Sequence, residues 1–353
     1  MGWDFFQSNG GRRAGGSAFP IPPHSEGQET DEETEASELD YETKERNISW
    51  GPINACPGTE SRNWSYRPAR FVDGKDAGQT VAWLRSPEGY PIPVRLGQIG
   101  AIVMRNEGGR LVREWYVAER VVAIHVQPFG WEEIEGLARA LQQEGFRLLD
   151  APQPYQEGRP NLTFECEPWR KSTQNRTLSE MTRLEQQAIA ANLSCPTLVD
   201  GRLAPRKSSF GLNDPMVGLI KTHGKPYLQT RRQWEVLYDL GPGQRTPAFA
   251  IQTKELRVVS FYVRLCDDRR GESLDSGIVR VELPAMYFEQ TLGRDWECLD
   301  RFAGLMADYR CRDETYGRAA ISIEPIVRAE ESLGSLFAQS EALISKFYNR
   351  TQL

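Results

Sequence analysis

The chain has 353 residues, of which 39% are hydrophobic and 26% charged, so it can form one large domain or two modest ones. No segment approaches the roughly 20 apolar residues that a membrane span requires, and the first residues lack the pattern of an export signal. Its six cysteines are scattered without a CxxC pair, which predicts reduced thiols in a cytoplasmic protein rather than disulfides or a zinc site.

The formal net charge of −6 is distributed unevenly along the chain. Residues 1–46 carry −7, which leaves +1 for the remainder. Glycine, proline and acidic residues dominate this first segment, and it offers too little apolar surface to offset chain entropy. We therefore expect a disordered acidic tail over residues 1–46, either simply solvated or shielding a basic cleft, and a folded domain over residues 47–353.

Apolar patterning in the first half of the chain predicts strands followed by helices. A strand is expected on each side of a turn at Asp73-Gly74, and two further strands come next. Two amphipathic helices follow, the second beginning with a capping box between Thr177 and Glu180. The expected ranges are 69–84 for the interrupted strand, 97–104 and 111–126 for the next two, and 131–145 and 177–192 for the helices.

The second half of the chain contains short apolar runs and then two long helical patterns. Strands are expected at 197–199, 216–220, 248–252, 258–265 and 278–283, and helices at 297–309 and 326–348. Strands that cluster early, with helices closing the chain, predict an α/β fold in which helices cover a mixed sheet.

A Val-Asp-Gly tripeptide occurs twice, at residues 72–74 and 199–201. Asp-Gly is a preferred turn dipeptide, so each aspartate alone has a structural explanation. Their order is more informative, because Glu185 lies on the helix expected between them and can reach the strand that carries Asp200. If the two strands are neighbours, Asp73, Glu185 and Asp200 can share hard cations such as Mg²⁺ or Mn²⁺. A pair of such ions suits phosphodiester hydrolysis.

Several segments resemble the NurA nuclease family, a branch of the ribonuclease H-like fold. The closing segment, 323–330, is similar to that family's last motif. The likeness extends roughly from Arg70 to Phe347. The other segments that carry it are the first Val-Asp-Gly, Arg183-Leu184-Glu185, Leu198 to Leu203, and Val217 to Thr222.

This resemblance implies a ribonuclease H-like mixed sheet and a Mn²⁺- or Mg²⁺-dependent deoxyribonuclease that acts on DNA ends with two ions per site. Asp73, Glu185 and Asp200 would be metal ligands, Lys221 would lie near the scissile phosphate, and Glu330 would take the closing ligand position. The resemblance also implies a homodimer that works beside a HerA-type hexameric ATPase in DNA repair or antiviral defence.

Two positions depart from the family pattern. Lys75 stands where the family has a small hydroxyl residue, and Glu330, with Glu331 as its rival, stands where histidine or aspartate is common. The stretch between the first two ligands is also long, which predicts an insertion around residues 86–160. These departures leave an alternative, a catalytically degenerate module that binds the ATPase. Another ribonuclease H-like enzyme, such as a transposase or an RNA nuclease, is a third.

Basic side chains follow the expected ligands along the chain and alternate with aromatic residues. This pattern is typical of phosphate tracking and base stacking, and a solubilising surface over core aromatics is the competing interpretation. The candidates for nucleic-acid binding are Arg202, Arg206, Lys207, Lys225, Tyr227, Arg231 and Arg232.

Overall fold

The structure is a computed structural model that describes residues 2–15, 36–57, 64–156, 159–160, 162–203, 210–222, 227–253, 256–267, 273–313 and 315–353. Among these residues, thirteen strands form one mixed sheet and helices pack on it, which confirms the expected α/β class. The strands of this sheet are β1 (Arg12–Arg13), β2 (Ala36–Glu38), β3 (Ile53–Asn54), β4 (Arg70–Arg85), β5 (Pro91–Glu107), β6 (Arg110–Ile124), β7 (Phe146–Asp150), β10 (Thr197–Asp200), β11 (Met216–Ile220), β12 (Gln244–Arg245), β13 (Phe249–Gln252), β14 (Arg257–Arg264) and β15 (Ile278–Pro284).

The strand order places the two Val-Asp-Gly segments at the centre of the sheet. The main path is β2-β13-β14-β15-β11-β10-β4-β5-β6-β7, and β1 pairs with β4 while β3 and β12 pair near β14. The pairs β4–β10, β10–β11 and β6–β7 are parallel, and the remaining pairs are antiparallel. A separate pair joins β8 (Tyr155–Gln156) to β9 (Arg159–Pro160).

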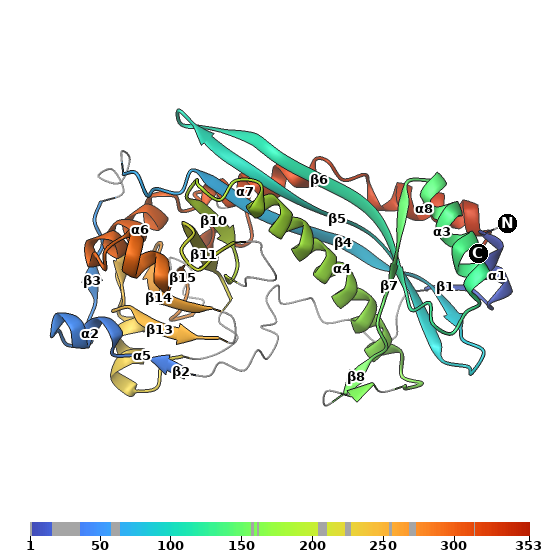
Figure 1. The fold of residues 1–353 in the computed structure, drawn as a ribbon, viewed down its shortest axis with the longest axis horizontal. Helices are drawn as coiled ribbons and strands as arrows, with labels where there is room; N and C mark the ends of the chain where they lie inside the picture. Colours follow the sequence, from blue (N-terminus) through green and yellow to red (C-terminus); the bar gives the residue numbers. More distant parts are fainter. Residues whose placement is uncertain are drawn as a thin grey trace.

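Helices cover both faces of the long strands. Ala101 packs with Leu184 of α4, whereas the adjacent Gly100 faces Leu333 of α7, so the two helices lie on opposite faces of β5. Figure 1 shows α4 running along β4, β5 and β6, which extend from the part that carries β13–β15 towards both chain ends. The helices are α1 (Asp4–Ser8), α2 (Tyr41–Arg46), α3 (Trp131–Gln143), α4 (Cys166–Ala190), α5 (Arg231–Tyr238), α6 (Trp296–Asp308), α7 (Glu324–Gly334) and α8 (Ser340–Thr351), with a π-helical turn η1 (Tyr287–Thr291) and a 3₁₀ turn η2 (Ala319–Ile321).

The turn expected at Asp73-Gly74 is wrong, because β4 continues through both residues to Arg85. Its partner β5 matches it in register from Arg70↔Arg105 to Thr80↔Arg95 without interruption. The dipeptide Asp73-Gly74 therefore lies within a strand and forms no turn. At the second tripeptide, Gly201 does leave the strand, since its φ of 117° is open mainly to glycine.

Two helix boundaries also differ from expectation. The second helix begins at Cys166 rather than Thr177, so Thr177 is an interior residue whose hydroxyl donates to Asp76 on β4 instead of capping the helix. The last helical pattern is divided into α7 and α8 by residues 335–339. The expected helix at 131–145 and the strands at 197–199 and 216–220 are confirmed within a few residues.

The disorder expected over residues 1–46 is wrong for residues 2–15 and 36–46. Phe5 and Phe6 of α1 are buried against Phe129 and Phe347, and β1 pairs with β4. Further along, β2 pairs with β13. Phe5 and Phe6 supply apolar surface for folding, which the charge-rich composition of the whole segment did not indicate. Residues 16–35 lie outside the described residues.

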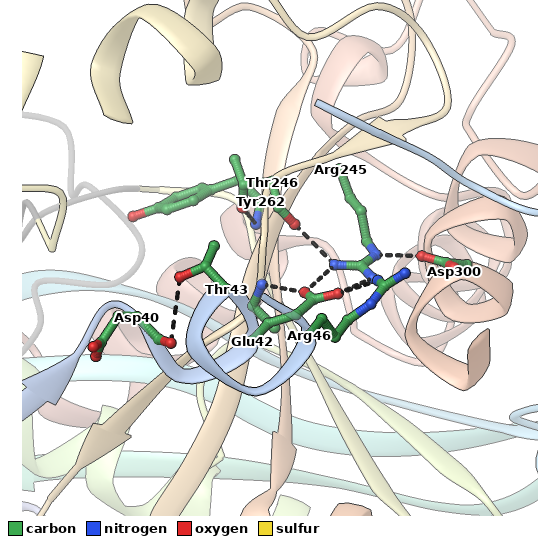
Figure 2. A network of polar contacts seen from close by, with 9 residues as sticks. Asp40, Glu42, Thr43, Arg46, Arg245, Thr246, Tyr262 and Asp300 are labelled. Carbon is green, nitrogen blue, oxygen red and sulfur yellow. Dashed lines mark hydrogen bonds and ion pairs between the residues drawn. The ribbon is translucent and has the colours of Figure 1, made fainter. Parts of the chain in front are cut away.

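A buried ion network fixes α2 to the sheet (Figure 2). The side chains of Glu42 and Arg245 are both fully buried, and two guanidinium nitrogens donate to the carboxylate over 2.7 and 2.9 Å. Arg245 Nε also donates to Asp300 on α6 over 2.6 Å, and the Ala248 N–H donates to Glu42. One network thus joins the N-terminal segment, the sheet and α6.

The six cysteines are all free, as the sequence spacing predicts. In the part of the chain that the structure describes, no helix combines the length and apolar character needed to cross a membrane.

Candidate active site

The parallel pairing of β4 and β10 brings the two Val-Asp-Gly segments side by side. Val72 is the register partner of Val199, so Asp73 and Asp200 follow at the same level on strands about 4.8 Å apart. Phe71 and Leu198 pack in the core beneath α6 and α7. Because side chains alternate along a strand, Asp73 and Asp200 point to that same face.

Glu185 reaches this pair from the other face because Gly74 has no side chain. A Cβ atom on Gly74 would overlap the Glu185 carboxylate, so the glycine allows α4 to approach the strand closely. Burial and the charge of Asp200 raise the pKa of Glu185 to about 8. Gly74 therefore allows the carboxylate of Glu185 to join those of Asp73 and Asp200.

Asp73 is the most buried member of this group. Its side chain is 7% exposed, and its Oδ2 has no hydrogen-bond partner among the described residues. Burial is the main cause that raises the pKa of Asp73 well above its usual range, and the charges of Asp200, Glu185 and Glu330 add to it while Lys221 opposes it. An unpaired buried carboxylate oxygen among other carboxylates is suited to bind a cation.

Lys221 lies where the sequence predicts it, directly after β11. Its Nζ is 2.6 Å from Asp200 Oδ2, and its side chain is only 6% exposed. Since β11 is the parallel neighbour of β10, the ammonium group is held at the ends of the same strands as the aspartates. Lys221 thus orients Asp200 and places positive charge beside the acidic group.

Glu330 on α7 approaches the same face, and Glu331 does not. One oxygen of Glu330 is 3.6 Å from Lys75 Nζ, and the other accepts a hydrogen bond of 2.7 Å from the Tyr316 hydroxyl. Glu331 instead pairs with Arg328 on the exposed side of the helix. The sequence offered no periodic signal for Tyr316, which precedes η2.

The donor set fits a hard cation only in part. Across the described ranges, no three His, Cys, Asp or Glu side chains are arranged to hold a metal ion. Carboxylate oxygens are the ligands that Mg²⁺ and Mn²⁺ prefer, and Asp73 Oδ2 remains unpaired beside Asp200 and Glu185. Asp73 therefore offers one free ligand oxygen to a divalent cation, whereas Glu330 already has partners for both oxygens.

Arg70 holds together the elements that carry the three carboxylates. Its buried guanidinium donates to the Ala188 and Asn192 carbonyls near the end of α4, to Thr197 at the start of β10 and to Glu114 on β6. Arg70, Ala188 and Thr197 each lie three residues from a carboxylate of the group. Arg70 therefore links β4, α4 and β10 close to the three carboxylates that these elements carry.

Replacing Arg70 by lysine should destabilise the protein by about 1–3 kcal/mol, because an ammonium cannot satisfy the same buried carbonyls. Chemical denaturation followed by circular dichroism measures this change. Arg110→Lys, at an exposed position at the start of β6, is the matched control and should stay within about 0.5 kcal/mol of the parent. Equal stability of the two variants would contradict the anchoring role.

The structure separates the candidates for nucleic-acid binding. Tyr227 is only 4% exposed and packs against Arg280 and Phe249, so the expected base stacking by this residue is wrong. Arg231 and Arg232 are exposed on α5 and both pair with Glu235. Arg202, two residues after Asp200, is partly exposed. The candidates Arg206, Lys207 and Lys225 lie outside the described residues.

A basic cleft that the sequence reasoning missed lies at the start of α7. Its volume is about 940 Å³, and four arginines line it together with three acidic residues, which leaves a formal excess of one positive charge: Arg67, Arg310, Arg312 and Arg328, with Asp308, Asp313 and Glu324. Its lining does not include the carboxylate group, but Glu330 is only two residues beyond Arg328 on α7, about 3 Å along the helix axis. The arginines come from three separate segments, so no local charge run marks the cleft in the sequence.

The chain is similar to the crystal structure of the NurA nuclease from Sulfolobus solfataricus, with 11% sequence identity, a TM-score of 0.43 and 88% of each chain covered. No family model matches the chain, and no curated protein matches it either.

Proposed function

We propose that this protein is a metal-dependent nuclease that hydrolyses phosphodiester bonds in DNA. The observation that carries the proposal is the unpaired Oδ2 of buried Asp73, set beside the carboxylates of Asp200 and Glu185. The NurA-like motifs support DNA as the substrate.

Asp73, Glu185 and Asp200 would hold the cation, Mg²⁺ or Mn²⁺. When bound, the ion supplies an activated water and neutralises charge that develops on the phosphate. Lys221 keeps Asp200 in place, and its remaining N–H groups are available to a phosphate oxygen at the same strand ends. Gly74 keeps the third carboxylate close enough to act with the other two.

The proposed partners are DNA, a second copy of the chain and a HerA-type hexameric ATPase that delivers DNA ends. The motif resemblance supports these partners, and the cellular role that fits them is DNA repair or antiviral defence. Mixing the purified protein with such an ATPase and measuring its mass by light scattering tests the assembly. A chain that remains alone and monomeric would contradict it.

Incubation of the purified chain with linear DNA tests the activity. We expect degradation with Mn²⁺ or Mg²⁺ and none with EDTA. The activity of Asp200→Asn should fall by more than about 100-fold, because losing a metal ligand costs more than losing a residue that supports one. Cleavage of RNA–DNA hybrids without cleavage of DNA would instead favour another ribonuclease H-like enzyme.

A second candidate function is a catalytically degenerate module that binds the ATPase. Two ion pairs favour it, because Lys75 already pairs with Glu330 and Lys221 already pairs with Asp200. Calorimetric titration with Mn²⁺ separates the two candidates. A nuclease centre binds the ion in a way that depends on Asp73, and a degenerate module does not bind it.

The basic cleft is the proposed path of a DNA strand towards the carboxylates. Arg310 and Arg312 both line the cleft, where their guanidinium groups can meet phosphates. Replacing both by alanine should weaken DNA binding uniformly across sequences and lower the slope of log affinity against log salt by about 1 per arginine. Fluorescence anisotropy at several salt concentrations measures both effects.

The matched control for the cleft replaces Arg231 and Arg232 by alanine. These arginines are exposed but share Glu235, so their removal should change the salt dependence less. A larger effect in the α5 variant than in the cleft variant would move the DNA path to α5.

A further inference from the structure

We propose that the ammonium group of Lys75 takes the place of a second metal ion beside Glu330, so that the site holds one divalent cation rather than two. This inference rests on the proposed function and concerns the number of ions at the same site. It revises the expectation of two ions per site that the sequence suggests.

The first observation is the position of Lys75 itself. It lies two residues after Asp73 on β4, so both side chains point to the face that α7 covers. Its Nζ is 3.6 Å from Glu330 Oε1, and both side chains are about one-third exposed. A lysine is a compact point charge, so it can neutralise a carboxylate in the space where a bound cation would sit.

The second observation is the set of partners around Glu330. The Tyr316 hydroxyl donates to Oε2 over 2.7 Å while Lys75 faces Oε1, so both carboxylate oxygens are engaged. Asp73 differs sharply, because its buried Oδ2 has no partner in the described part of the chain. The carboxylate oxygen that can accept a cation is therefore on Asp73 and not on Glu330.

The third observation is the balance of charge. Asp73, Glu185, Asp200 and Glu330 are four carboxylates, and Lys75 and Lys221 are two ammonium groups, which together give a formal charge of −2. One divalent cation neutralises this group. Two ions would leave the group with a formal charge of +2, and uncompensated charge is costly where side chains are buried. Removing Lys75 vacates space beside Glu330 and makes the formal charge of the group −3, so that two ions would leave only +1.

Titration with Mn²⁺, followed by calorimetry and by electron paramagnetic resonance without DNA, tests the inference. We expect one ion per chain in the parent protein, two in Lys75→Ser and one in Lys75→Arg, which keeps the charge. Lys171→Ser, at an exposed position on α4, is the control and should bind one. Two ions in the parent, or one in a folded Lys75→Ser, would overturn the proposal.

Glu330→Gln provides a test that does not depend on how Lys75→Ser folds. Because Glu330 is not a ligand of the single ion in this scheme, the variant should still bind one Mn²⁺, and loss of that ion would contradict the scheme. Asp73→Asn should bind none. If the parent binds no Mn²⁺, or if Asp73→Asn binds it equally well, the proposed function itself fails, and that result differs from a wrong number of ions.

Discussion

Asp73→Asn should abolish Mn²⁺-dependent degradation of linear DNA while the protein remains folded. The amide removes the negative charge and one ligand oxygen at the most buried carboxylate of the group, so the site can no longer hold the cation. We expect activity to fall by more than about 100-fold, since even the loss of an outer partner of a metal ligand costs about 10- to 100-fold. Gel assays of end-labelled DNA at several enzyme concentrations measure the loss.

The same substitution should leave stability unchanged or raise it slightly. Asp73 is buried among like charges, so removing its charge relieves repulsion in the absence of metal. Thermal unfolding in EDTA checks this expectation. Asp239→Asn, at an exposed position after α5, is the control and should keep full activity. Full activity in purified Asp73→Asn would refute the assignment of this site.

Glu42→Gln should lower the free energy of unfolding by about 3–5 kcal/mol, the usual cost of breaking a buried ion pair on one side. Glutamine leaves Arg245 fully buried beside Asp300 alone and cannot accept the Ala248 N–H and the guanidinium with the same charge. Urea denaturation at neutral pH measures the difference. Glu45→Gln removes an exposed partner of Arg294 and should cost no more than about 1 kcal/mol.

The stability that Glu42 provides should depend on pH in a defined direction. Burial alone would raise the pKa of Glu42, but the hydrogen bonds and charge of Arg245, with the Ala248 N–H and Arg46, outweigh it and lower the pKa. The contribution is therefore complete above the unfolded value of about 4.3 and is lost as the pH falls through the lower folded value. The difference in free energy of unfolding between the parent and Glu42→Gln should become smaller below about pH 4. A difference that stays constant with pH would contradict this.

Sequence patterns were sufficient where one local signal decides the structure. The helix over 131–145 has an apolar stripe and ends near a glycine, and the strands that carry Asp200 and Lys221 are short apolar runs. The approach of Glu185 to Asp200 also followed from spacing, because a helix that precedes a strand so closely has to run back across it. These elements need no information from distant residues.

Patterns failed where a residue's partner is remote in sequence. Glu42 lies in an acidic run that is typical of a solvated segment, yet its partner Arg245 is 203 residues away. Asp73-Gly74 has the composition of a turn, but the glycine serves the close approach of Glu185. Arg70 and Tyr316 carry no motif of their own, and only the folded chain shows which groups they hold.

The packing of Phe5 and Phe6 against Phe347 sets an order of events during synthesis. The core at that end of the molecule needs residues from both the first and the last helix, which lie together in Figure 1. At 5–20 residues per second, the ribosome takes roughly 20 to 70 s to make the intervening chain. Phe5 can pack against Phe129 early, whereas the contact between Phe6 and Phe347 has to wait until α8 emerges.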